Sequence, residues 1–90
     1  MKTWFIYEVT NWLGITERIS VWANNDDEAK EKLEKELKHP PKELKYIGNS
    51  CYYPREDVGR KCFYGMSAVD IGIAYGLGDM FIGLKYAKNN

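Results

Sequence analysis

The first part of the chain has the hydrophobic pattern of strands, and a helical repeat follows it. The segments from Trp4 to Thr10 and from Thr16 to Ala23 are rich in aromatic and β-branched residues, which is typical of strands. From Asn25 to Lys38 the apolar residues recur every four positions, as in an amphipathic helix. The pattern predicts a β-hairpin followed by one helix.

Both ends of this helix are specified by local sequence. Asn25 is a suitable N-cap, and the acidic run 26–28 places negative charge at the positive end of the helix dipole. Pro40 and Pro41 end the helix just past Lys38. One narrow apolar stripe is expected to dock on a sheet, and its members are Ala29, Leu33 and Leu37.

The hairpin register follows from its connection, Asn11 to Ile15, which carries asparagine and glycine where a tight turn needs them. With Thr10 opposite Thr16, one side of the hairpin pairs Glu8 with Arg18 and Trp4 with Trp22. A connection one residue shorter would bring Glu8 and Glu17 together, so we favour the first register. It turns one apolar set toward the helix: Phe5, Tyr7, Ile19, Val21 and Ala23. Trp4, Ile6 and Trp22, with Glu8 and Arg18, then lie on the far face.

Two further hairpins are predicted after the helix. A strand from Glu43 to Tyr53, a loop over 54–59 and a return strand from Arg60 to Tyr64 would place Cys51 opposite Cys62. Without a secretory signal we expect two reduced thiols, with a disulfide as the alternative.

The last hairpin would turn at 76–79, between strands over 69–75 and 80–86. This register pairs Gly72 with Gly83 and Asp70 with Lys85. The predicted fold is therefore a single α+β domain over residues 1–90, an antiparallel sheet of about five to six strands with one helix packed on one face.

Composition excludes several classes of function. Lysine plus arginine equals aspartate plus glutamate at 13 each, so no net field attracts nucleic acid or an anionic membrane. The apolar stretch 64–87 contains Asp70, Asp79 and Lys85, which argues against a membrane span. The start of the chain lacks an apolar leader, and we expect a cytoplasmic protein.

Residues suited to catalysis are few. The single histidine, His39, lies at the predicted helix C-terminus, where a polar or positive group favours the helix dipole. We therefore prefer this structural role over a Cys62/His39 dyad, and the spacing of Cys51, Cys62 and His39 fits no zinc pattern. We expect no enzyme activity, no cofactor and no metal site.

Aromatic surface is the remaining candidate. The chain has 3 tryptophans, 7 tyrosines and 3 phenylalanines, more than one short helix can cover, and such side chains are enriched in interface hot spots. The residues expected to bind a partner protein through a sheet face and its loops are Trp4, Trp12, Arg18, Trp22, Tyr52, Tyr53 and Arg55. Three alternatives are a far face covered by the last hairpin, a homodimer built on that face, and a single-stranded nucleic-acid binder with Arg18, Arg55, Arg60 and Lys61 on phosphates.

In its hairpin, acid-capped helix and further strands, Lys2 to Tyr46 resembles small phage-encoded inhibitor proteins, including some of the anti-CRISPR kind. The resemblance lies in the organisation of about half the chain. It implies a protein that acts in the host cytoplasm by occupying a surface on a host complex.

Overall fold

The computed structural model describes residues 2–51 and 59–75 of the 90-residue chain. The elements, in chain order, are β1 (Thr3–Thr10), β2 (Thr16–Ala23), α1 (Asp26–Leu37), β3 (Glu43–Ser50), β4 (Arg60–Cys62) and α2 (Ala68–Tyr75). The predicted α+β class is confirmed.

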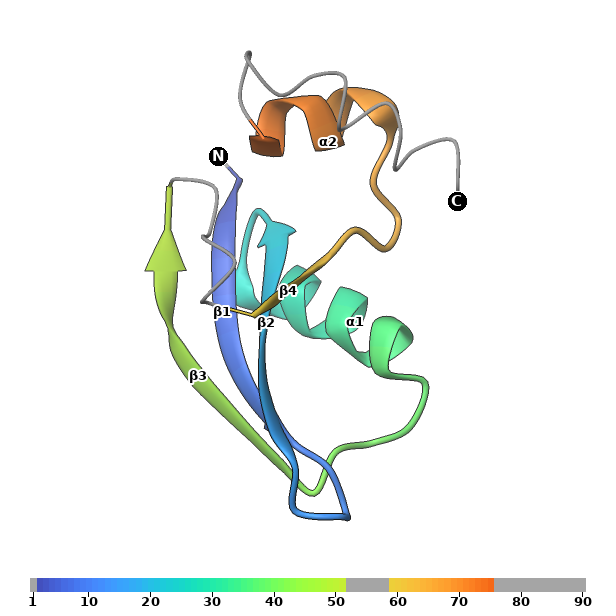
Figure 1. Ribbon diagram of the computed structural model, residues 1–90. Helices are drawn as coiled ribbons and strands as arrows, with labels where there is room; N and C mark the ends of the chain where they lie inside the picture. Colours follow the sequence, from blue (N-terminus) through green and yellow to red (C-terminus); the bar gives the residue numbers. More distant parts are fainter. Residues whose placement is uncertain (1, 52–58, 76–90) are drawn as a thin grey trace.

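These strands form one four-stranded sheet in the order β3-β1-β2-β4 (Figure 1). β1 pairs antiparallel with β2 and β3, whereas β2 pairs parallel with β4. Within the described residues the sheet is thus mixed, with four strands, and the prediction of an all-antiparallel sheet of five to six strands is only partly correct. Helix α1 packs mainly against β2 and β4, and α2 lies beyond the end of the sheet where the chain begins (Figure 1).

The predicted hairpin register is confirmed at every pair. Thr10 lies opposite Thr16, Glu8 opposite Arg18, and Trp4 opposite Trp22. The predicted apolar set of the helix-facing side, together with Val9, Ala29, Leu33 and Cys62, forms one buried cluster.

Helix α1 begins as predicted. Asn25 has extended backbone angles, and its side chain accepts a hydrogen bond of 2.8 Å from the Glu28 amide. The Glu28 carboxylate in turn accepts one of 2.8 Å from the Asn24 amide, so the two side chains satisfy amides at the helix start. At the other end, Lys38 takes a positive φ of 64° and donates its amide to the Glu34 carbonyl.

The far face of the hairpin is covered at one end. Trp4 and Trp22 are 0% and 7% exposed, with ring centroids 5.4 Å apart. They pack with Met66 and Ile71, and Phe63 meets Trp4 edge-on at 6.4 Å. The residues that cover this face come from the segment after β4, so the chain has a second, smaller core.

The expected strand over 69–75 is wrong, because this segment is helix α2. Ser67 and Asp70 form the reciprocal cap of a helix start: the Asp70 amide donates to the Ser67 hydroxyl at 3.2 Å, and the Ser67 amide to the Asp70 carboxylate at 3.4 Å. Asp70 also pairs with Lys2 at 3.1 Å. Its predicted partner Lys85, Gly83 and the predicted turn lie outside the described residues.

The expected hairpin between a strand from Glu43 to Tyr53 and a return strand from Arg60 to Tyr64 is also wrong. β3 ends at Ser50, on one edge of the sheet, and β4 lies on the opposite edge. Cys51 is exposed, Cys62 is buried, and both are free thiols. The disulfide alternative is therefore excluded by the topology, because the two cysteines do not face one another.

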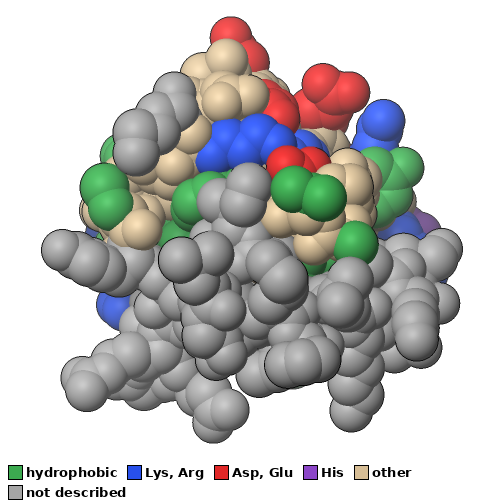
Figure 2. Space-filling model, turned by 90° about the horizontal axis from the view of Figure 1, so that it is seen from above, with side chains coloured by type: hydrophobic (Ala, Val, Ile, Leu, Met, Phe, Trp, Pro, Cys, Tyr) green, Lys and Arg blue, Asp and Glu red, His purple; other side chains and the backbone are tan. Residues whose placement is uncertain are grey.

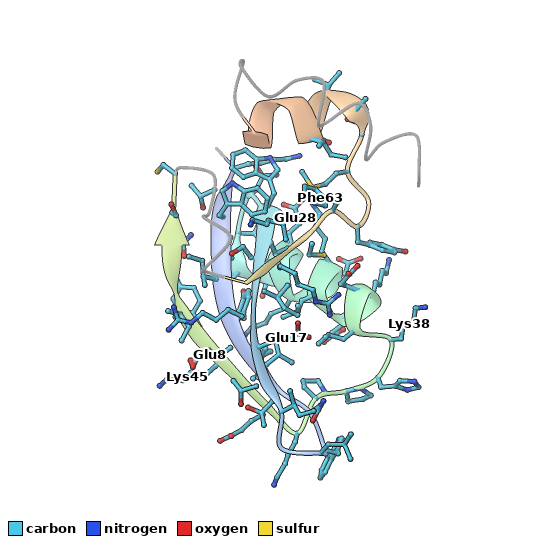
Figure 3. All side chains as sticks on the ribbon, viewed as in Figure 1. Glu8, Glu17, Glu28, Lys38, Lys45 and Phe63 are labelled. Atoms are coloured by element: carbon cyan, nitrogen blue, oxygen red, sulfur yellow. The ribbon has the colours of Figure 1, made fainter. Side chains whose placement is uncertain are left out.

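Charged residues of both signs lie together on the described part of one face. Seen from the α2 end, Lys or Arg and Asp or Glu side chains lie next to one another (Figure 2). Arg60 donates to Glu17 at 3.1 Å and to Glu36 at 2.8 Å, which ties β4 to β2 and α1. Glu8 of β1 lies between Arg18 of β2 and Lys45 of β3 in the register (Figure 3).

Candidate protein-interaction site

The structure separates the residues that the sequence proposed as partner contacts. Trp4 and Trp22 are buried in the second core, so the expectation that they are exposed is wrong. Trp12 is 74% exposed in the hairpin loop, and Arg18 is exposed on the far face. Tyr52, Tyr53 and Arg55 lie outside the residues that the structure describes.

The loop that carries Trp12 is held by its own hydrogen bonds. The Asn11 side-chain oxygen accepts from the amides of Leu13 at 2.9 Å and Ile15 at 3.0 Å. The Asn11 amide donates to the Ile15 carbonyl, and Gly14 supplies the positive φ of 84° that the turn requires. The loop is therefore an ordered platform.

Large apolar side chains project from this platform. Trp12 is 74% exposed, Leu13 85% and Ile15 61%. Burying side chains of this size gains about 1.5–3 kcal/mol each relative to leaving them in water. The hairpin loop thus holds three adjacent groups whose exposure has no explanation within the described fold.

The connection between α1 and β3 lies against the same loop. The Trp12 indole Nε1 donates to the Pro40 carbonyl at 3.3 Å, and the Lys42 amide donates to the Thr10 carbonyl at 2.9 Å. We call the resulting patch the tip surface, and it consists of Trp12, Leu13, Ile15, Pro40 and Pro41.

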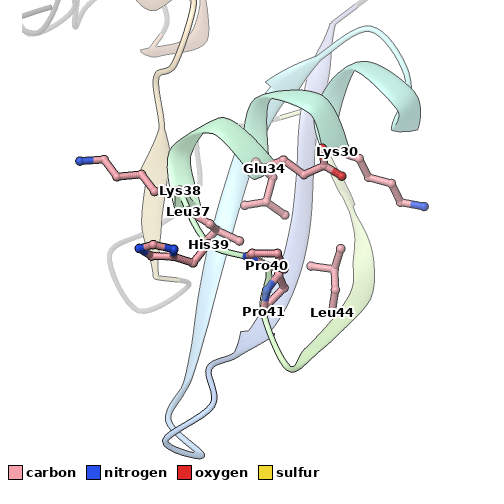
Figure 4. Close-up of a pocket in the computed structure, with 9 residues that line it drawn as sticks. Lys30, Glu34, Leu37, Lys38, His39, Pro40, Pro41 and Leu44 are labelled. Carbon is pink, nitrogen blue, oxygen red and sulfur yellow. The ribbon is translucent and has the colours of Figure 1, made fainter.

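Two shallow hollows flank the pair of prolines. One, of about 300 Å³, lies between α1 and the start of β3 (Figure 4), and its apolar lining is Leu33, Leu37, Pro40, Pro41 and Leu44. The other, of about 220 Å³, lies on the hairpin side, and its apolar lining is Val9, Trp12, Ile15, Leu37 and the two prolines. Both are at or below the small end of ligand pockets, so each suits one or two side chains of a partner.

Cys62 and His39 are the residues that the sequence offered for a catalytic pair. Burial raises the pKa of the Cys62 thiol to about 11, so the thiol stays protonated near neutral pH and is a poor nucleophile. His39 lies on the exposed connection after α1, and the structure does not bring it to Cys62, whose sulfur approaches the Lys32 carbonyl at 3.8 Å. Residues 2–51 and 59–75 contain no cluster of three side chains suited to hold a metal ion.

Sequence reasoning missed four residues of the tip surface: Leu13, Ile15, Pro40 and Pro41. Leu13 and Ile15 were assigned only to a turn, and the prolines only to the end of the helix. The available signal was the composition of the loop, because 3 large apolar residues among the 5 from Asn11 to Ile15 are unusual in a hairpin connection, where small and polar residues dominate.

Across the described part of the chain, no helix is long and apolar enough to cross a membrane. No protein-family model, no curated protein and no solved structure matches this chain.

Proposed function

We propose that the protein binds another protein through the tip surface. The observation that carries this proposal is the exposure of Trp12, Leu13 and Ile15, each more than 60% accessible, on a loop fixed by hydrogen bonds. Exposed apolar groups that gather on an ordered surface are typical of interaction sites.

Trp12 is the expected anchor. Tryptophan is enriched among interface hot spots because it buries a large area at low conformational cost. Its indole is already oriented by the hydrogen bond to the Pro40 carbonyl, so little side-chain freedom remains to be lost on binding. The two hollows beside the prolines would accept side chains of the partner.

A protein partner fits this surface better than single-stranded nucleic acid does. Stacking sites for bases are normally framed by cations that contact phosphates. Arg60, one of the arginines expected in that role, is engaged by Glu17 and Glu36. The hairpin-side hollow has a mainly apolar lining, and its polar members are Asn11, Glu17 and His39, with no lysine or arginine among them.

The mode of action that goes with this proposal is occupation of a surface on the partner without chemistry. The resemblance to small phage-encoded inhibitors suggests a host defence complex as the partner, in the host cytoplasm. This identity and this location stay predictions.

The test is affinity capture from lysate of the source cell, with and without nuclease, followed by quantitative mass spectrometry. The wild-type chain is compared with Trp12→Ala and with Val69→Ala, a matched control that is 70% exposed on α2. We expect a stoichiometric protein that survives nuclease, is lost with Trp12→Ala and is retained with Val69→Ala.

Two results would contradict the proposal. Equal capture by Trp12→Ala and wild type would remove the tip surface from the interaction. Loss of all captured protein on nuclease treatment would favour the nucleic-acid alternative.

A further inference from the structure

Strand β3 forms one edge of the sheet. Within the described residues it pairs with β1 on one side, and no strand pairs with its other side. At eight residues it is as long as the hairpin strands. An edge of this length presents a row of backbone amide and carbonyl groups, which is a template for a further strand.

Apolar side chains are exposed along this edge. Leu44, Tyr46 and Ile47 are 41%, 52% and 39% exposed. Leu44 and Tyr46 lie on the helix side of the sheet, because they pair with Val9 and Tyr7 of the core that faces α1. Helix α1 packs mainly over β2 and β4, so among the described residues this part of β3 is only partly covered.

A bulge limits the regular part of the edge. Tyr7 pairs with Tyr46 and Ile6 with Gly48, so Ile47 is an extra residue in the pairing with β1. The strict alternation of inward and outward backbone groups therefore holds from Glu43 to Tyr46 and breaks after it. A partner strand would use this first half of β3.

The alternation restricts how a second copy could pair. Every second residue of β3 points its N–H and C=O groups outward, and in an antiparallel pair outward residues face outward residues. A symmetric pair of β3 strands must therefore place its two-fold axis on a residue, and within the regular part that residue is Glu43, Leu44, Lys45 or Tyr46.

Charge selects one of these axes. An axis on Glu43 sets two carboxylates opposite one another, and an axis on Lys45 sets two ammonium groups opposite one another, which is unfavourable in either case. An axis on Tyr46 would pair Lys45 with the bulged Ile47, where the alternation fails. An axis on Leu44 pairs Glu43 with Lys45 of the second copy, and does so twice by symmetry.

We propose that the chain forms a homodimer in which two β3 strands pair antiparallel about Leu44. The two sheets become one continuous sheet of eight described strands, two times the four of one chain, with both α1 helices on the same face. Leu44 also lines the larger hollow beside α1, so its meeting with Leu44 of the second copy brings the hollows of the two chains together. This inference goes beyond the proposed function and does not depend on it.

The first test is a charge exchange read by light scattering after size exclusion. Wild type is expected to be a dimer, and Glu43→Lys and Lys45→Glu are each expected to be monomers, because each sets like charges opposite one another twice. An equimolar mixture of the two variants is expected to regain the dimer, because every cross-strand pair is then of opposite sign. A wild type that stays monomeric at every concentration reached, or a mixture that does not associate, would overturn the proposal.

The second test is independent of charge and uses the residue on the axis. In a Cys51→Ser background, Leu44→Cys is expected to oxidise to a disulfide-linked dimer, because residues directly opposite in an antiparallel pair have Cα atoms about 4.5–5.5 Å apart. The matched control, Lys45→Cys, faces Glu43 of the second copy instead of itself and is expected to form no disulfide-linked dimer. Equal cross-linking of both variants would rule out this register.

The charge exchange also changes a contact within the monomer, and the cysteine test separates this effect from dimer formation. Lys45 lies opposite Glu8 of its own chain, so Lys45→Glu removes one favourable neighbour within the monomer. Thermal melting of each variant shows whether it is folded, and Leu44→Cys leaves Glu43, Lys45 and Glu8 unchanged.

Discussion

The hydroxyl of Tyr7, in the middle of β1, donates a hydrogen bond of 2.6 Å to the Asp26 carboxylate in the first turn of α1. The bond joins the sheet to the helix at the helix end whose dipole already favours an anion. Lys30 adds an ion pair to the same carboxylate at 3.1 Å. The Tyr7 bond, followed by Lys30, lowers the pKa of Asp26, and burial followed by Asp26 raises the pKa of Tyr7.

Tyr7→Phe is expected to lower the free energy of unfolding by about 1.5 kcal/mol near neutral pH. This is the low end for a hydrogen bond to a charged group, because the Asp26 side chain is half exposed. Asp26 has a lowered pKa in the folded state. Its contribution to stability is therefore present above the pKa of the unfolded state and is lost as the pH falls through the pKa of the folded state. Tyr7 has a raised pKa, so its contribution is present below about pH 10 and is lost as the pH rises further. Urea unfolding at a series of pH values measures the free energy of unfolding of wild type and of Tyr7→Phe. The difference between them should be largest near neutral pH and should shrink at acid and at alkaline pH.

The control for this prediction is Asp26→Asn, which keeps an acceptor for Tyr7 but removes the titrating carboxylate. The free energy of unfolding of this variant should no longer show the part of the decrease at acid pH that Asp26 causes. A Tyr7→Phe variant whose difference from wild type is constant from acid to alkaline pH would contradict the assignment.

Replacement of Trp22 and replacement of Trp12, which the sequence predicted to be exposed alike, should have different effects on stability. Trp22 is 7% exposed and packs against Trp4, so Trp22→Ala is expected to cost about 3–5 kcal/mol through cavity formation. Trp12 is 74% exposed, so Trp12→Ala should stay within about 0.5 kcal/mol of wild type. Denaturant unfolding of both variants checks this, and similar losses would place Trp12 in a core.

The two thiols should react at different rates. Cys51 is exposed, whereas Cys62 is 1% exposed and burial raises its thiol pKa to about 11. With iodoacetamide near pH 8, the native protein is expected to take up one label quickly, at Cys51, and the second only on unfolding. Peptide mapping by mass spectrometry identifies the site, and denatured protein is the control in which both react. Fast labelling of native Cys62 would contradict its burial.

Gly59 should tolerate no side chain. Its φ is +98°, and a Cβ built there would lie 2.0 Å from the Arg18 carbonyl oxygen, which belongs to the neighbouring strand β2. Gly59→Ala is expected to cost more than about 1–2 kcal/mol, the conformational penalty alone, because backbone must also move. Gly48→Ala on β3 is the control, since a Cβ there meets nothing within 4 Å. Equal melting temperatures for the two variants would contradict the close approach of Gly59 to β2.

The elements that could be predicted from the sequence are those whose contacts lie between residues close together in the chain. The β1–β2 register could be predicted pair by pair because a five-residue connection leaves few ways to align two alternating strands. Asn25 and the acidic run predicted the start of α1 because capping depends on adjacent residues. The spacing of Ser67 and Asp70 is the same kind of signal for α2, but the alternation of apolar residues over 69–75 favours a strand.

Long-range pairing could not be predicted in the same way. Arg60–Cys62 would suit an antiparallel partner or a parallel one, and only the close approach of Gly59 to Arg18 and the bonds of Arg60 to Glu17 and Glu36 decide for β2. The burial of Trp4 and Trp22 likewise depends on Met66 and Ile71, more than 40 residues away from Trp22. The same tertiary contacts leave Trp12 as the tryptophan available to a partner.

By itself, then, the sequence determined the hairpin, its register, helix α1 and the helix-facing core. Each of these depends on the spacing of apolar residues, on helix capping or on turn residues within a short stretch of chain. The tertiary structure alone decided which sheet edge each later strand joined, which face the second core covered and where the tip surface formed. The physical reason is that burial is a property of the whole packed chain: an apolar residue is marked in the sequence, but what covers it is not.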